Sequence, residues 1–301
     1  MTARAGLAEP TEVDVPIRSG RLHGQRFGSA SAPLALCVPG LSANMKSFDF
    51  IGERLGGESL QVVALDLRGR GLSTAGSVGS YGWAAHARDV LDLASALGFE
   101  QFTLIGHSMG GAVGLQVAAI AAARLQRLVL IDVCGQPDPS TGPLIQSAVD
   151  RLGTVVPSLA AYIERVRRVG TVSPWSDYFE RYFAYELETV EGGLRSRTSR
   201  EAVLEDSGEF ERNDVYALWR LLTMPVLLVR AARELLPGHG YIVTPADRDR
   251  FAREVPGARV VEVDANHYGI ITAEATVQSI REFLGCVRPT RRARKARPQP
   301  T

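Results

Sequence analysis

Short apolar runs that alternate with helix-like segments constrain the fold of this chain most strongly. Runs this short and unbroken are typical of strands that are covered on both faces. We expect such strands at Leu34–Val38, Val62–Leu65, Phe102–Ile105, Leu128–Ile131, Pro225–Val229 and Val260–Val263. Helical patterns lie between or after them, at Trp83–Leu97, Met109–Leu125, Ala246–Val255 and Ala273–Leu284. This alternation predicts βαβ units and a mostly parallel sheet.

The remaining segments suggest how the chain is divided. Two strand-like runs, Val13–Arg18 and Leu22–Phe27, precede the alternating pattern and bring the expected sheet to eight strands. The pattern breaks between 136 and 222, where we expect several helices, including one over Trp175–Glu188, and no buried strand. We therefore predict four parts. They are a flexible leader (1–11), a core (12–135 and 223–287), an inserted helical lid (136–222) and a disordered basic tail (288–301).

Charge and composition favour a globular body that does not bind nucleic acid. Hydrophobic residues make up 45% of the chain and charged residues 22%, which is ordinary for a globular protein. The last fourteen residues hold six Lys and Arg and no acid, so the formal net charge of +1 becomes −5 for residues 1–287. A mildly acidic body argues against a nucleic-acid partner.

The cysteines and the apolar stretches indicate the cellular compartment in which we expect this protein. Cys37, Cys134 and Cys286 are too far apart for a metal cluster, and an odd, sparse count suits a reducing compartment. Met1–Pro10 lacks the apolar run of a signal peptide, and the longest apolar stretch, Val117–Ala123, is too short to cross a bilayer. We expect a cytoplasmic protein with no membrane partner and no metal.

The segment Gly106-His-Ser-Met-Gly110 matches the pattern GxSxG, in which a serine acts as a nucleophile. Its context matters more than the match, because it follows the strand at Phe102–Ile105 and begins the helix at Met109. Such a strand–turn–helix places the Ser108 hydroxyl at the edge of the sheet. A phosphate-binding loop is the alternative, but GxGxxG and GxxxxGK[ST] are both absent there.

These motifs, in their order and spacing, resemble the α/β-hydrolase superfamily over about residues 12–286. Besides Ser108 and its neighbours, the shared segments are Val38–Asn44, Asp66–Ser73 and Asn266–Tyr268. The resemblance implies an eight-stranded, mostly parallel sheet flanked by helices, with a helical lid insertion. The segment Asp66-Leu-Arg-Gly-Arg-Gly71 is typical of turn glycines with an Asp–Arg brace beside the active site.

A serine needs a base, and His267 is the best of the five histidines. It follows the last expected strand at the edge where ligands bind in open α/β sheets, and it lies late in the chain, as the order Ser–acid–His requires. His107 is next to Ser108, so its side chain is directed away from it. His23, His86 and His239 do not follow the end of an expected parallel strand.

Two acids compete for the role of orienting His267. Asp132 ends the strand Leu128–Ile131, where some members of the superfamily carry their acid, and Glu234 follows the strand at Pro225–Val229, where members more often do. We favour Asp132, because the segment around Glu234 lacks the usual Gly-Glu-x-Asp form and holds two arginines that could pair with it. Asp264 is too near His267 in the loop to reach its ring.

Further site residues follow from the motif and the resemblance. The backbone N–H of Met109, the residue after the nucleophile, is expected to bind the oxyanion, and the resemblance adds the N–H of Leu41. Aromatic residues recur at helical spacing within 175–183, which is more typical of a lid core than of a pocket. If they do line a pocket, Trp175 and Phe179 are the candidates to contact an apolar substrate.

Together these residues predict a serine hydrolase that cleaves a small carboxylic ester or lactone through an acyl-enzyme. The expected machinery is Ser108, His267 and Asp132, with no cofactor, in a monomer or homodimer. A C–C bond hydrolase, and an acyltransferase or thioesterase, use the same parts and remain alternatives. A non-catalytic binding protein is disfavoured because Ser108 and His267 are both present.

Overall fold

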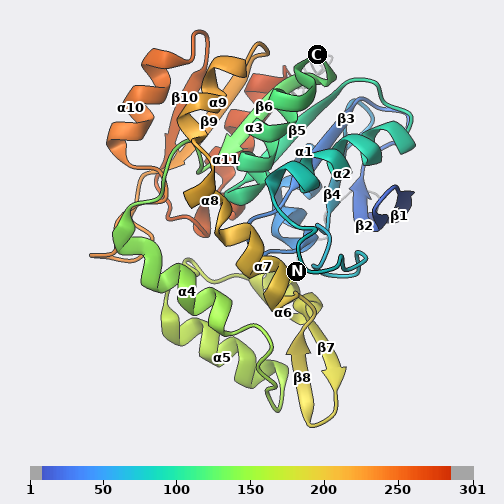
Figure 1. The fold of residues 1–301 in the computed structure, drawn as a ribbon, viewed down its shortest axis with the longest axis vertical. Helices are drawn as coiled ribbons and strands as arrows, with labels where there is room; N and C mark the ends of the chain where they lie inside the picture. Colours follow the sequence, from blue (N-terminus) through green and yellow to red (C-terminus); the bar gives the residue numbers. More distant parts are fainter. Residues whose placement is uncertain (1–8, 286–301) are drawn as a thin grey trace, which may run out of the picture.

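The computed structural model describes residues 9–285, and an eight-stranded sheet lies at its centre (Figure 1). The strand order is β1-β2-β4-β3-β5-β6-β9-β10. Strand β2 is antiparallel to β1 and β4, and all the other neighbours are parallel. The strands are β1 (Thr11–Ile17), β2 (Gly20–Phe27), β3 (Leu34–Val38), β4 (Gln61–Leu65), β5 (Phe102–His107), β6 (Leu125–Ile131), β9 (Val226–Ala231) and β10 (Arg259–Val263). The predicted fold class, a mostly parallel eight-stranded sheet flanked by helices, is confirmed.

Helices cover both faces of this sheet, which explains why its central strands are apolar throughout. In β3, Leu36 and Val38 belong to one buried cluster, whereas Ala35 and Cys37 belong to another on the opposite face. The first cluster includes side chains of α2 (Trp83–Ala96), α3 (Met109–Ala121) and α10 (Pro245–Glu254). The second includes α1 (Asp49–Leu55), which we had not predicted, and α11 (Glu274–Leu284).

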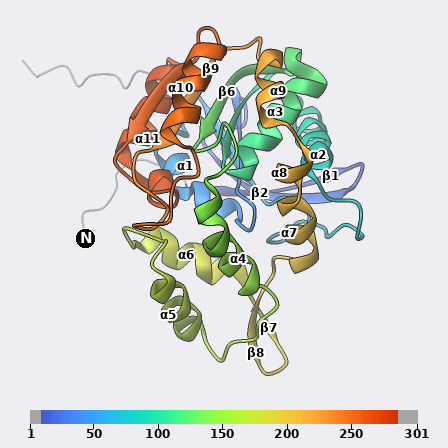
Figure 2. The same ribbon diagram turned by 60° about the vertical axis from the view of Figure 1, so that its left-hand side comes forward.

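Residues between β6 and β9 form an inserted segment, and Figures 1 and 2 show much of it beyond one end of the sheet. We call residues 136–222 the inserted segment. Its elements are α4 (Gly142–Asp150), α5 (Leu159–Val169), α6 (Asp177–Glu186), β7 (Leu187–Val190), β8 (Gly193–Ser196), α7 (Arg200–Ser207), α8 (Glu209–Arg212) and α9 (Val215–Leu218). Side chains of α5 and α6, among them Tyr162 and Phe183, join the second buried cluster and so attach the segment to the core.

The hairpin β7–β8 differs from the sequence-based expectation. We predicted helices alone in this segment, with one running to Glu188, but α6 ends at Glu186 and an antiparallel hairpin follows. Its strands have four residues each and are only partly buried, so they lack the continuous apolar run by which a central strand is recognised.

The predicted basic tail at 288–301 lies wholly outside the described residues. The predicted leader at 1–11 lies partly outside them, because residues 1–8 are not described. Within residues 9–285, no helix has the length and apolar character that crossing a membrane requires.

Helix α3 lies unusually close to the sheet because glycines face it. A methyl group on Gly111 would overlap Cγ1 of Val133, and it would lie 3.2 Å from Cδ2 of Leu130. Both neighbours are completely or almost completely buried, so they have little room to move. The small residues after Ser108 are therefore needed for packing as well as for the turn.

Gly111→Ala should therefore destabilise the protein even though alanine is the better helix former. Overpacking of a tight core costs about 1–3 kcal/mol, which exceeds the helix propensity gained. Gly142→Ala in α4 is the matched control, since nothing lies within 4 Å of its added methyl group. Thermal unfolding should show a lower Tm for Gly111→Ala and an unchanged or slightly higher Tm for Gly142→Ala. Equal Tm values for the two variants would contradict this account of the packing.

Candidate active site

Ser108 occupies a strained turn between β5 and α3. Its φ of 54° and ψ of −127° are unfavourable for a residue with a side chain. The turn is possible because its flanking glycines have no side chains. A methyl group on Gly106 would collide with the backbone of Gly110, and one on Gly110 would collide with the carbonyl oxygen of Val38. The GxSxG spacing is therefore a steric requirement that presents the Ser108 side chain at the end of β5.

Asp132 and His267 meet beside this turn. The Nδ1 atom of His267 donates a hydrogen bond of 2.8 Å to Oδ2 of Asp132. Asp132 follows β6 and is 1% exposed, and its Oδ1 accepts a hydrogen bond of 3.0 Å from the N–H of Ala231 in β9. The carboxylate is thus held by the neighbouring strand while it orients the imidazole. Of the two acids that the sequence left open, Asp132 is the one in contact with His267.

Glu234 is engaged elsewhere. Its Oε2 accepts a hydrogen bond of 2.8 Å from the N–H of Gly238, within its own loop. The arginines that we expected to pair with it have other partners, because Arg230 pairs with Glu262 and Arg233 pairs with the exposed Asp264. Asp264 is thus paired with Arg233 rather than with His267.

Two residues that sequence reasoning did not assign hold the His267 loop in place. His107 donates a hydrogen bond of 3.0 Å from Nε2 to the carbonyl oxygen of His267, and the two rings are 4.5 Å apart. Burial, together with the charge of His267, lowers the pKa of His107 well below its usual value, so this ring stays neutral. Asn266 donates to the carbonyl oxygen of Thr171 and accepts from the N–H of Gly269. Asn266 stands in the motif quoted above, but only the fold reveals what it binds.

The N–H groups of Leu41 and Met109, which we expect to bind the oxyanion, come from two different elements near Ser108. Met109 is the first residue of α3, so its N–H has no partner within the helix. Leu41 follows β3 and lines the same cavity as Ser108. Among residues 9–285, neither N–H donates a hydrogen bond to the protein. Both donors are therefore available to a bound oxygen atom.

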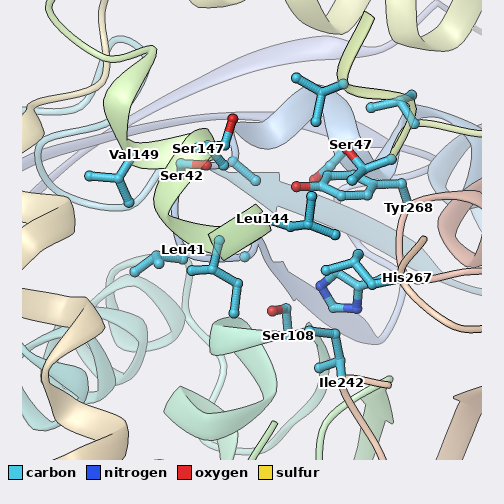
Figure 3. A pocket seen from close by; sticks show the side chains of 18 of the residues that line it. Leu41, Ser42, Ser47, Ser108, Leu144, Ser147, Val149, Ile242, His267 and Tyr268 are labelled. Carbon is cyan, nitrogen blue, oxygen red and sulfur yellow. The ribbon is translucent and has the colours of Figure 1, made fainter. Parts of the chain in front are cut away.

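A cavity of about 270 Å³ lies over Ser108 and His267, between the strand ends and the inserted segment. Figure 3 shows Leu41, Leu144 and Ile242 around these two residues, with Tyr268 above His267. The Ser108 hydroxyl is turned away from the imidazole in this view, and rotation to another staggered χ1 angle redirects it. No group of three or more potential metal-binding side chains occurs within the described part of the chain.

The two aromatic residues that we expected at the substrate pocket are in different positions. Phe179 lines the cavity, whereas Trp175 is not among the lining residues. The Trp175 ring instead stacks on Phe183 with centroids 5.7 Å apart, and Arg167 covers its ring. Phe179 lies within α6, whereas Trp175 precedes the first residue of this helix, Asp177, so the helical spacing does not place the two rings on one face. Trp175 supports Phe183 from outside.

Comparisons with known proteins show the family to which this chain belongs. The family model for the alpha/beta hydrolase fold matches residues 33–274. The N-formylmaleamate deformylase of Pseudomonas putida is 32% identical over 248 residues, which cover 81% of this chain and 84% of the deformylase. A putative carbamate hydrolase, RutD of Agrobacterium fabrum, is 34% identical over 132 residues, which cover 44% of this chain and 49% of RutD. The crystal structure of E-2-(acetamidomethylene)succinate hydrolase has a TM-score of 0.82 at 25% identity, covering 92% of this chain and 100% of that one. The chain belongs to the α/β-hydrolase family and is a hydrolase.

Proposed function

We propose that this hydrolase works through a covalent acyl-enzyme on Ser108, with His267 as the base and Asp132 as the orienting acid. The observation that carries the proposal is the 2.8 Å hydrogen bond from His267 Nδ1 to Asp132, at the edge of a cavity that Ser108 also lines. With its proton fixed on Nδ1, the imidazole presents the lone pair of Nε2 to the serine.

The reaction then proceeds in two steps. Nε2 of His267 takes the proton of the Ser108 hydroxyl as Oγ attacks the carbonyl carbon of the substrate, and the imidazolium next protonates the leaving group. Water, activated by the same imidazole, releases the acyl group and restores the serine. Asp132 remains ionised and stabilises the imidazolium in each step.

The N–H groups of Met109 and Leu41 stabilise the oxyanion of the tetrahedral intermediate. The Met109 N–H is at the N-terminus of α3, where helix geometry leaves N–H groups free to bind an anion. The Leu41 N–H approaches from the loop after β3. Donors fixed in advance stabilise charge that develops only in the transition state, which is why they accelerate the reaction.

An ester or lactone is the first candidate for the bond cleaved. The cavity walls include Leu144, Val149 and Ile242, which suit an apolar acyl group or ring. An N-formyl amide is the second candidate, because a relative that is 32% identical over 81% of this chain is a deformylase. Arg165 also lines the cavity and suits a substrate that bears a carboxylate, whereas Arg151, which lines it too, is already paired with Glu186.

A substrate panel tests both bond classes. It comprises p-nitrophenyl esters of graded chain length, a set of lactones and N-formyl amides with and without a carboxylate. Wild type should turn over at least one class, and Ser108→Ala should lose nearly all of that activity while keeping the wild-type Tm. The residual rate should be roughly 10³–10⁴-fold above that in water. Full activity in Ser108→Ala would remove Ser108 from the role of nucleophile.

Paired substitutions test the acid. Asp132→Asn should lower kcat on the order of 10⁴-fold, because it allows His267 the wrong tautomer. Glu234→Gln is the matched control and should lower kcat about tenfold at most, because Glu234 caps only its own loop. Steady-state kinetics on the best substrate of the panel measures both. The reverse ranking would transfer the orienting role to Glu234.

A further inference from the structure

A buried cluster of Arg70, His86 and Asp206 joins the inserted segment to the sheet core. All three side chains are 0% exposed. Asp206 is in α7 of the inserted segment, Arg70 is in the loop after β4, and His86 is in α2. We had expected an Asp–Arg brace within Asp66–Gly71. Instead Asp66 binds the Met45 and Leu72 N–H groups and the Tyr185 hydroxyl, and the acid that pairs with Arg70 comes from α7.

Asp206 accepts hydrogen bonds from Arg70 and from two further groups. Its Oδ2 accepts a bond of 2.6 Å from Nη2 of Arg70 and one of 2.8 Å from Nε2 of His86. Its Oδ1 accepts a bond of 2.7 Å from the N–H of Gly82. Burial alone raises the pKa of Asp206, but the hydrogen bond from His86 and the charge of Arg70 outweigh it and lower this pKa to about 2. Burial also lowers the pKa of His86, so the cluster carries one positive and one negative charge.

Arg70 in turn holds the loop that carries Leu41. Its Nη2 and Nε atoms donate to the Leu41 carbonyl oxygen at 2.8 and 3.2 Å. The preceding carbonyl, that of Gly40, accepts a hydrogen bond of 3.1 Å from the N–H of Ala43. The Leu41 N–H belongs to the same peptide group as the Gly40 carbonyl, so its direction is fixed from both sides. A planar guanidinium suits this task because its donors have a fixed geometry.

We propose that Arg70 is a positioning residue for the oxyanion hole, set in place by Asp206 of the inserted segment. The proposal rests on the proposed function, because it assigns the Leu41 N–H to the oxyanion. It adds that correct docking of α7 is required for full catalytic power. The Leu41 N–H is proposed to bind the negative charge of the oxyanion, which forms in the transition state and is absent from the bound substrate. Loss of Arg70 should therefore lower kcat far more than it changes KM.

Arg70→Met tests this, with Arg68→Met as the matched control. Arg68 is two residues away in the same loop and also binds a buried carboxylate, with Nε 2.6 Å from Oδ2 of Asp89, but its side chain donates to Asp89 and Ser80 and not to Leu41. Arg70→Met should lower kcat roughly 10- to 100-fold, because small displacements at a reacting centre have effects of this size. Its KM should stay within about threefold of wild type. Arg68→Met should keep the wild-type kcat, and Arg70→Lys should recover only part of the loss.

A second measurement separates positioning from a general loss of structure. An aryl trifluoromethyl ketone, which forms a tetrahedral oxyanion on an active serine, should bind Arg70→Met more weakly by the same factor as kcat falls. Rates are normalised to the fraction of enzyme that a fluorophosphonate titrates, so unfolded protein is not counted. If Arg70→Met does not fold, Asp206→Asn should show the same pattern with a fall of about three- to tenfold in kcat.

The outcomes distinguish the two proposals. Equal kcat values for Arg70→Met and Arg68→Met, or a fall confined to KM, would overturn the positioning role while leaving the serine mechanism intact. A wild-type enzyme that neither reacts with the fluorophosphonate nor binds the ketone would instead overturn the proposed function itself.

Discussion

The strained backbone at Ser108 is the constraint on which the rest of the site depends. A residue with a side chain at positive φ costs of order 1–3 kcal/mol and persists only where its surroundings enforce it. Here β5 is paired on both sides before the turn, and α3 is packed tightly against the sheet after it. The strain places the serine at the sheet edge where β3, β6 and β10 also end. The loops that follow these strands therefore begin close to Ser108.

Two parts of the fold hold the site residues in place at that edge of the sheet. One comes from the sheet, where Asp132 follows β6, is held by β9 and orients His267. The other comes from the inserted segment, which provides part of the cavity wall and, through Asp206 and Arg70, braces the Leu41 loop. In this account the sheet positions the proton-transfer groups, and the inserted segment completes the environment of the developing charge.

Much of the fold could be predicted because it depends on local patterns. A strand that is covered on both faces must be apolar throughout, and a serine at a strained turn must have glycines beside it, so both features are visible in a few consecutive residues. The hairpin β7–β8 was missed because its short, half-buried strands have no such pattern. The contact between Asp132 and His267 could be favoured but not fixed, since their distance depends on the order of strands in the sheet.

The roles that could not be predicted all depend on tertiary contacts. Trp175 and Phe179 share a spacing but not a position, because α6 begins at Asp177 and Trp175 therefore lies before the helix that carries Phe179. Asp206 has no motif around it, and its importance follows only from three partners that lie more than a hundred residues away in sequence. His107 is near Ser108 in sequence, yet its partner is the carbonyl of His267.

Identification of the acylated residue tests the central claim most directly. The enzyme would be mixed with a reactive ester, quenched in acid during turnover and analysed by mass spectrometry of the intact chain and its peptides. The account predicts that one acyl group is attached per chain, that it maps to Ser108, and that it accumulates to a higher level in Asp132→Asn if deacylation is slowed more than acylation. An acyl group on another residue, or turnover of the ester without any covalent adduct in either protein, would contradict the account.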